Sequence, residues 1–493
     1  MEKSLFIITL ITSLCGFSQN EEDALRYSQT YLGGTARNIS MAGAMTSIGG
    51  DYSASSQNPA AMGRFSKHNF IITPTIESNS SNSRFYNNSD SYQSAAIKIG
   101  NLSYMKAYQL PAEKYNGWVS MQLGAGYNRI NSFESVKRYS GEIDSSIIHN
   151  FINEANGTNP DFIYADHPWG ASLAYDTYAI DPNSDNTYST NLTSGNTQHA
   201  RTIRTDGGIG EYSFAMSGNY KNKFYVGGTV NLVRVKYESN FSHKETFTAK
   251  DSIWLNSLEY LGSLTTKGWG YNVKVGAIFL PTPNLRIGLA IHSPTFFTLK
   301  DFWGNDMKTN TDDPNFPIKS IKDEFKPTGE YDYRITTPLK ANLSLGYIIK
   351  KKASIGTEFE FINYADTKLK SIKFSDAPYS FISENAQIKN IYRPRFNFKI
   401  GGEYRVNPMV YLRAGYAYYS SPFSKESGIS TSATQFITGG FGINLGNYYF
   451  DFALAHKNIS YNYYAYNPDL KGSTALFIEN NLNFSASIGF RFE

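Results

Sequence analysis

The sequence has almost no cysteine and no long apolar run after its first residues. Its 493 residues include one cysteine, Cys15, so a mature chain that begins after it has no disulfides and no thiol chemistry. Past the N-terminus, no stretch reaches the 18 or so apolar residues that indicate a membrane-spanning helix. Charge is nearly balanced, with 46 Lys and Arg against 42 Asp and Glu, which excludes the basic footprint of a nucleic-acid-binding protein.

Motifs of catalysis and cofactor binding are lacking too. The sequence has no nucleophile elbow, no CxxC pair and no Gly-Lys-Ser/Thr after its glycines, so we expect neither an enzyme nor nucleotide-powered transport. The seven histidines show no paired metal spacing. We therefore expect no catalytic residue, no metal and no cofactor.

Residues 1–19 have the pattern of a secretion signal. Lys3 precedes a mostly apolar run, 5–17, and small residues near its end offer a cleavage site. The mature chain is expected to begin near residue 19 or 20. A lipoprotein acylated at Cys15 is the alternative, although Leu14 is bulkier than the residue usual before such a cysteine.

Aromatic residues and glycine are abundant, with 37 Tyr, 33 Phe and 40 Gly. They occur in a chain where apolar and polar residues alternate. In 396–405 (FNFKIGGEYR) all charged residues share one face, which only a period of two achieves. The last strand pattern, 482–492, alternates in the same way. A soluble β-sandwich would also alternate, but the export signal, the number of strands and the aromatic last strand together favour a transmembrane β-barrel.

These patterns predict an all-β fold, an antiparallel transmembrane barrel of about 14 strands spanning 67–493. The expected strands are 68–77, 94–106, 117–131, 210–220, 223–238, 268–280, 284–293, 332–349, 353–364, 391–405, 408–420, 434–446, 448–457 and 481–492. The apolar phase slips within 224–237, which predicts a β-bulge.

Three longer inserts, 141–207, 294–331 and 367–392, are expected to be extracellular loops, because the long loops of such barrels face outward. Their apolar residues either pack within the loops or form a landing site for a hydrophobic ligand.

The stretch 33–65 (GGTARNISMAGAMTSIGGDYSASSQNPAAMGRF) precedes the first strand and is rich in glycine and small residues. We expect 20–66 to be a hatch inside the lumen, because a barrel of this width leaks unless it is filled. Within it, Asn58 can hydrogen-bond neighbouring backbone and Pro59 fixes the turn before Ala60. The alternative is that Asn58 and Pro59 only end a short helix.

Four segments together resemble the FadL-type outer-membrane transporters of hydrophobic compounds, in the form typical of Bacteroidetes-like bacteria. They are 33–65, 210–230 (GEYSFAMSGNYKNKFYVGGTV), 274–297 (KVGAIFLPTPNLRIGLAIHSPTFF) and 331–348 (YDYRITTPLKANLSLGYI). The resemblance implies a 14-stranded outer-membrane barrel with Asn58, Pro59 and Ala60 in a hatch. It also implies passive uptake of long-chain fatty acids or other hydrophobic small molecules. The ligand-binding residues remain unassigned.

The resemblance further implies a lateral opening at a kinked third strand, in contact with outer-membrane lipid. Gly124 and Gly126 are our candidates, because glycine lets a strand bend. The alternative is that both glycines face the lumen and make room for the hatch.

We expect a monomer that does not bind nucleic acid. A different function, as a surface shuttle or scaffold in protein secretion, is the alternative to transport. Some relatives are called haemin receptors, a role that the scattered histidines do not support.

Overall fold

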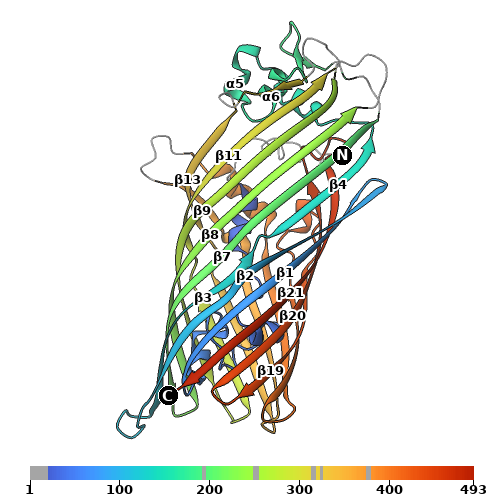
Figure 1. The fold of residues 1–493 in the computed structure, drawn as a ribbon. Coiled ribbons are helices and arrows are strands. Elements are labelled where there is room, and N and C mark those ends of the chain that lie inside the picture. The colour runs from blue at the N-terminus through green and yellow to red at the C-terminus, as the bar shows by residue number, and fades with distance from the viewer. Residues whose placement is uncertain are drawn as a thin grey trace, which may run out of the picture.

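The computed structural model describes residues 20–190, 192, 196–247, 255–311, 318–322, 326–372 and 379–493. The expected secretion signal, 1–19 with Cys15, lies outside these residues. Tilted antiparallel strands form a closed barrel with the C-terminus at the end that carries short turns (Figure 1). The opposite end carries the long connections, and we expect it to be the extracellular end, because the long loops of outer-membrane barrels face outward.

The barrel wall contains fourteen strands within the described residues, each corresponding to one of the expected segments. Four of them consist of two consecutive segments: β3/β4, β10/β11, β13/β14 and β15/β16. Pairing of β1 with both β2 and β21 closes the sheet. The bounds are β1 (His68–Phe85), β2 (Asn88–Gln109), β3 (Trp118–Ser132), β4 (Ser135–Ile143), β7 (Thr197–Tyr220), β8 (Phe224–Phe247), β9 (Leu255–Phe279), β10 (Leu285–His292), β11 (Phe296–Thr311), β13 (Thr328–Thr336), β14 (Lys340–Ile349), β15 (Ala353–Asn363), β16 (Lys368–Ser371), β17 (Pro394–Arg405), β18 (Val410–Tyr419), β19 (Thr434–Leu445), β20 (Tyr448–Tyr464) and β21 (Thr474–Phe492).

The β-bulge predicted within 224–237 is wrong, because β8 keeps a continuous register with both β7 and β9. The apolar phase slips for another reason. Near the short-turn end, Val226 and Val230 face outward and are about half exposed, as lipid-facing residues are. Further out, Val233 and Val235 are buried on the lumen side. The apolar face therefore changes from outside to inside where β8 leaves the expected membrane band.

The long connections differ from the expected loops. The insert expected at 141–207 shortens to 144–196, and its described residues contain α4 (Ile148–Ala155), η2 (Pro160–Phe162), α5 (Ile163–Asp166), α6 (Ala171–Asp176) and the small pair β5 (Asp181–Pro182) and β6 (Tyr188–Ser189). Most of 294–331 is instead barrel wall, in β11 and β13, with β12 (Ile318–Ser320) paired to β11. The insert 367–392 holds β16 and α7 (Ile382–Ile391).

The described part of 144–196, named here the extracellular cap, lies over one side of the barrel mouth (Figure 1). Its residues Ile147, Ile148 and Phe151 are buried in one cluster with the outer ends of β8, β9 and β11. These apolar residues pack within the structure, which was one of the two expectations for them.

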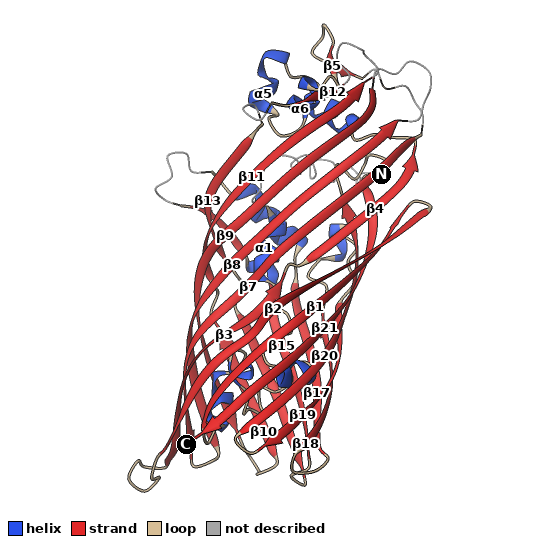
Figure 2. Cartoon of the chain, viewed as in Figure 1, coloured by secondary structure: helices blue, strands red, loops and turns tan. Residues whose placement is uncertain are grey.

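Residues 20–66, named here the N-terminal segment, lie inside the barrel (Figure 2). They form α1 (Glu21–Ser28), α2 (Ala36–Ser40), α3 (Tyr52–Ser55) and the 3-10 helix η1 (Pro59–Arg64). From Thr35 to Gly49 every residue except Arg37 is buried. No helix among the described residues is long and apolar enough to cross a membrane.

Candidate functional site

Glycines in the barrel wall leave room for the N-terminal segment. A Cβ atom at Gly356 would lie 2.0 Å from the carbonyl oxygen of Ala44, and one at Gly401 would lie 2.2 Å from that of Met41. Equivalent close approaches recur around the barrel. They occur at Gly124 on β3, Gly227 on β8, Gly276 on β9, Gly346 on β14, Gly415 on β18 and Gly440 on β19. Side chains at these positions would displace the segment.

Ion pairs and hydrogen bonds fix the same segment to the wall. Arg37 forms a two-pronged pair with Glu403 at 3.0 and 3.1 Å. Arg286 on β10 donates to the carbonyl oxygen of Ile48 at 2.6 Å. Charge-assisted contacts in a buried setting hold a segment in one position, so the N-terminal segment is an integral part of the barrel interior.

The tripeptide Asn58-Pro59-Ala60 begins a helix; it does not end one. The Asn58 side chain accepts a hydrogen bond from the Ala60 N–H at 3.1 Å and donates to the carbonyl oxygen of Ala277 on β9 at 3.3 Å. Pro59 occupies the first turn of η1, where its missing N–H costs nothing. The tripeptide thus fixes the end of the N-terminal segment against the wall.

Gly124 and Gly126 lie in a regular part of β3. Strand β3 pairs without interruption from Ser120 to Arg129, and its register with β7 shifts before and after this stretch. A Cβ at Gly126 would lie 2.6 Å from a ring carbon of Tyr52, and one at Gly124 would lie 3.0 Å from the same ring. The contacts are those expected of glycines that make room for the N-terminal segment.

The third barrel strand is interrupted further out. Pairing of β2 with β3 ends at Asn101 and Asn128, a bulge in β2 falls at Gly100, and Phe133 and Glu134 separate β3 from β4. Beyond Gly100, β2 pairs with β1 but has no ladder to β3 or β4 among the described residues. We name this interruption of the wall the lateral gap.

Lys98 on β2 spans the lateral gap. Its Nζ lies 3.0 Å from Glu134 and 2.9 Å from Asp206 on β7. On the outer face beside it, Ile97 is 75 % exposed and Ile99 is 42 % exposed, as expected of residues that face lipid. The gap therefore opens at the level of apolar outer residues, where Lys98 bridges it, and further out Asn88 and Asp90 on β2 contact Ser140 on β4.

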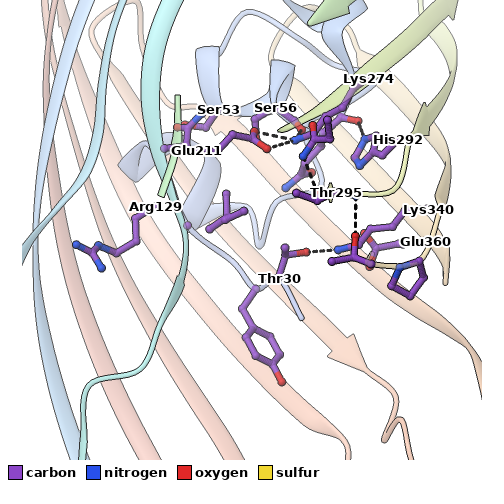
Figure 3. Close-up of a pocket in the computed structure, with 18 of the residues that line it drawn as sticks. Thr30, Ser53, Ser56, Arg129, Glu211, Lys274, His292, Thr295, Lys340 and Glu360 are labelled. Carbon is purple, nitrogen blue, oxygen red and sulfur yellow. Dashed lines mark hydrogen bonds and ion pairs between the residues drawn. The ribbon is translucent and has the colours of Figure 1, made fainter. Parts of the chain in front are cut away.

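A small cavity of about 80 Å³ lies between the N-terminal segment and the barrel wall, where it is lined by residues of β3, β7, β9, β10, β14, β15, β17 and β18 (Figure 3). Lys274 reaches across it to Glu211 and donates to the carbonyl oxygen of Ser56 at 2.8 Å. Lys340 donates to the hydroxyl of Thr30 at 2.6 Å. Paired charges occupy this cavity, and they join the N-terminal segment to the wall.

A larger cavity of about 300 Å³ lies behind the lateral gap. It combines apolar and charged residues. Its apolar lining is Tyr31, Leu32, Ile39, Phe133, Tyr237, Phe436 and Ala455, and its charged lining is Arg26, Glu77, Arg129, Glu134, Lys137, Lys457 and Glu479. Tyr31, Gly33 and Arg129 also line the small cavity, so the two cavities adjoin.

Two cations of the large cavity have no carboxylate partner within ion-pair distance among the described residues. Lys457 Nζ lies 4.9 Å from the centre of the Tyr31 ring. Arg129 makes one long hydrogen bond, 3.5 Å to the carbonyl oxygen of Gly207, and its Nε is buried without a partner. By contrast, Lys137 pairs with Glu479 at 3.1 Å. The sequence analysis missed Arg129 and Lys457, because nothing in strand alternation tells a paired lumen cation from an unpaired one.

The chain matches the family model described as outer membrane protein transport protein (OMPP1/FadL/TodX) over residues 19–442. No curated protein sequence matches it.

Solved structures share the fold. A FadL homologue from Pseudomonas aeruginosa has a TM-score of 0.55 at 14% identity, covering 94% of this chain and 99% of its own. The toluene transporter TodX of P. putida has a TM-score of 0.53 at 13% identity, with 94% and 99% covered. The monoaromatic hydrocarbon channel CymD has a TM-score of 0.51 at 12% identity, with 94% and 98% covered. At these identities the likeness shows the architecture alone.

Proposed function

This chain belongs to the OMPP1/FadL/TodX family of outer-membrane transport proteins, and we propose that it is a passive channel for long-chain fatty acids or similar molecules with an apolar tail and an anionic head. Membership places it in the outer membrane among channels for hydrophobic compounds. The observation that carries the choice of substrate is the mixed lining of the large cavity, with its two cations that lack a carboxylate partner.

An anionic head group fits this cavity better than a neutral hydrocarbon does. A carboxylate near Arg129 and Lys457 would supply the charge-assisted contacts that these cations lack among the described residues. Its tail would lie on the apolar lining, such as Phe133 and Phe436. A toluene-like ligand would bury the same cations without pairing them, which costs free energy.

We propose the lateral gap as the route between cavity and membrane. The cavity is lined from both sides of the gap, by Gly100 on β2 and by 129–137 on β3 and β4. Apolar Ile97 and Ile99 flank the gap on the outer face. A tail that leaves the cavity there would enter lipid without crossing water, and the Lys98 bridge would have to open. In this proposal the opening lies near 129–134, further out along the strand than Gly124 and Gly126.

We also propose that the N-terminal segment is the hatch of this channel. Its burial inside the lumen and the wall glycines that fit it support this role. It would block polar solutes while leaving the large cavity accessible from the gap.

Binding of a long-chain fatty acid and of its methyl ester to the purified barrel tests the substrate class. We expect the acid to bind more tightly than the ester, and Lys457→Met or Arg129→Met to weaken the acid about 10-fold, the value of one charged hydrogen bond. Neither variant should weaken ester binding, because the neutral ester leaves the cation that it buries without a charged partner. Lys471→Met, an exposed lysine outside the cavity, is the matched control.

Equal binding of acid and ester by the wild-type barrel would contradict the proposed head-group site. If neither compound binds and secreted proteins co-purify with the barrel, the secretion-scaffold alternative is favoured.

A further inference from the structure

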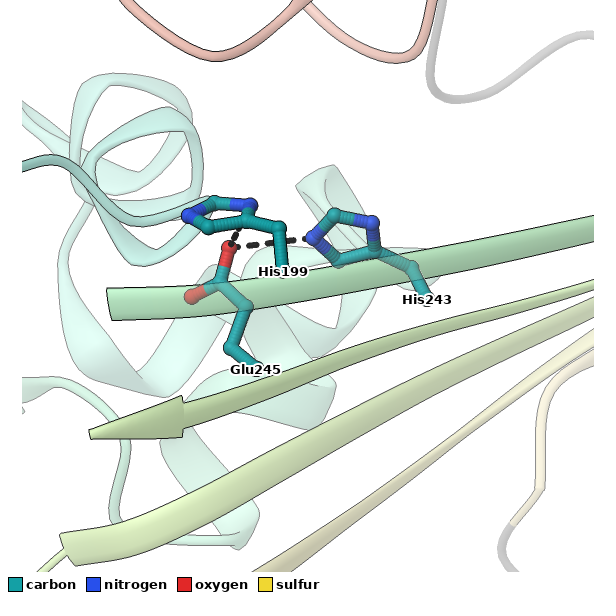
Figure 4. Close-up of side chains that lie close together, drawn as sticks. All are labelled: His199, His243 and Glu245. Carbon is teal, nitrogen blue, oxygen red and sulfur yellow. Dashed lines mark hydrogen bonds and ion pairs between the residues drawn. The ribbon is translucent and has the colours of Figure 1, made fainter. Parts of the chain in front are cut away.

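Two of the seven histidines meet at the extracellular end of the barrel, far from the cavities. His243 and Glu245 are two residues apart on β8, so both side chains point to the same face. His199 on β7 stands directly across the ladder from Glu245. All three side chains are fully buried, and Figure 4 shows both imidazole rings directed toward the Glu245 carboxylate. The signal in the sequence was His243-x-Glu245, and the partner His199 lies 44 residues earlier, in the preceding strand.

The hydrogen bonds of His199 leave its other nitrogen facing an acceptor. Nε2 lies 2.9 Å from the carbonyl oxygen of Ser145. Because a carbonyl only accepts, Nε2 carries a proton, and in the neutral ring Nδ1 then has a lone pair. Nδ1 faces Glu245 Oε1 at 3.2 Å. Two buried acceptors at this distance repel one another unless a cation or a proton lies between them.

Glu245 Oε1 has more neighbours than lone pairs. It accepts from the Ile147 N–H at 2.8 Å and also contacts His243 Nε2 at 3.0 Å and His199 Nδ1. A carboxylate oxygen offers two lone-pair sites, so Oε1 cannot make a favourable contact with all three neighbours. One nitrogen of each ring, His243 Nδ1 and His199 Nδ1, is also buried without a hydrogen bond among the described residues. The three side chains therefore do not satisfy one another.

We propose that His199, His243 and Glu245 bind a divalent transition-metal ion, with zinc as the best fit. The ligand atoms lie within 4.8 Å of one another, and tetrahedral zinc with bonds of about 2.0–2.1 Å separates its donors by about 3.3 Å. Two imidazole nitrogens and one carboxylate oxygen are a donor set that zinc accepts. With an ion in place, Oε1 keeps two partners, the metal and the Ile147 N–H.

Groups around the three ligands orient them for this role. The carbonyl oxygen of Ser145 fixes the His199 ring, and the hydroxyl of Ser146 donates to Glu245 Oε2. Such outer contacts are typical of metal-binding histidines and carboxylates.

Arg201 opposes the ion. It stands across the ladder from His243, and its guanidinium lies over the ring of Phe241 at 4.3 Å. Its positive charge would weaken binding of a second cation. We therefore expect Arg201→Gln to tighten metal binding.

The ion would join the barrel to the extracellular cap. Ser145, Ser146 and Ile147 begin the cap and contact the ligands directly. Binding would therefore stabilise the start of the cap over the barrel mouth, a structural role independent of what the channel transports.

Metal analysis of the full-length barrel, purified without a polyhistidine tag, tests the site. After dialysis against zinc and then buffer, we expect one zinc per chain, lost in His199→Ala and in Glu245→Gln. His167→Ala is the matched control, because His167 lies 3.6 Å from Glu154 in the cap and belongs to no cluster of three possible metal ligands among the described residues. We expect this variant to keep the ion. Zinc should also slow amide hydrogen exchange over 144–156 in the wild type and in His167→Ala, and should not do so in His199→Ala or Glu245→Gln.

Heat-modifiable migration on gels identifies variants that still assemble as barrels, and only these are compared. A wild-type barrel without retained zinc, or zinc retained equally by His199→Ala and Glu245→Gln, would overturn the proposal. Transport of fatty acid is measured separately, so its failure would leave the metal result intact.

Discussion

Substitution of Gly126 by valine tests whether the N-terminal segment closes the lumen. Gly126 on β3 faces the ring of Tyr52 on α3, and a Cβ there would lie 2.6 Å from that ring and 2.7 Å from the Cβ of Ser103. Neither neighbour can give way easily, because Tyr52 is 1 % exposed and its hydroxyl contacts Ser213 Oγ at 2.9 Å. The valine should therefore push α3 out of its position.

The free-energy cost of Gly126→Val to the placement of the segment is the sum of two contributions. Overpacking a close contact costs about 1–3 kcal/mol, and loss of the Tyr52 hydrogen bond adds about 1 kcal/mol. A total of about 2–4 kcal/mol would raise the ratio of displaced to correctly placed segment roughly 30- to 900-fold.

Single-channel conductance in planar bilayers measures the result. We expect Gly126→Val barrels to conduct small ions for a larger fraction of time than the wild type. Gly439→Val is the matched control, because the nearest atom to a Cβ there is 3.8 Å away. The double variant Tyr52→Ala, Gly126→Val should destabilise the placement of the segment by less than the sum of the two single effects, because the two positions are in contact. Assembled Gly126→Val barrels with wild-type conductance, or strictly additive effects in the double variant, would refute the reasoning.

Three further predictions concern the N-terminal segment, the lateral gap and the cap. Deletion of 33–61 should leave an assembled barrel that leaks polar solutes in a liposome-swelling assay, and a tight deleted barrel would exclude a hatch. Lys98→Met removes both ion pairs across the gap, so fatty-acid uptake should rise roughly 5-fold, equivalent to about 1 kcal/mol; unchanged uptake would show that the gap is not the route. Burial raises the pKa of Glu154 from 4.5 to about 7, so cap stability should be full below pH about 4.5 and decline as pH rises through 7, by at most about 3 kcal/mol. Hydrogen exchange of α4 measures this, and Glu154→Gln should remove the pH dependence.

The membrane part of the fold was predictable because lipid imposes one pattern on every strand. The alternation in 396–405 matches β17 and that in 482–492 matches β21. Outside the membrane band this constraint ends. Thr197–Asp206 on β7 is polar on both faces, and the sequence analysis therefore took it for loop. Likewise β11 falls within the insert 294–331, which the sequence analysis took for an extracellular loop.

The candidate site was less predictable, because it depends on pairs from distant strands. Glycine content and position were enough to propose that 20–66 fills the lumen. Gly126 and Tyr52 are in contact although the sequence separates them by 74 positions, and Lys98 pairs with Glu134 across 36 positions. Nothing in the sequence around Lys457 shows that it has no carboxylate partner among the described residues. These residues meet only because of the order of the strands around the barrel.

Identification of the molecule bound in the large cavity tests the proposed function most directly. The barrel is extracted from its membrane in polymer nanodiscs without detergent, and small molecules released from it are analysed by mass spectrometry. The account predicts long-chain monocarboxylic acids bound to the wild type and depleted in the double variant Arg129→Met, Lys457→Met. Neutral hydrocarbons, or phospholipid alone in both proteins, would contradict it.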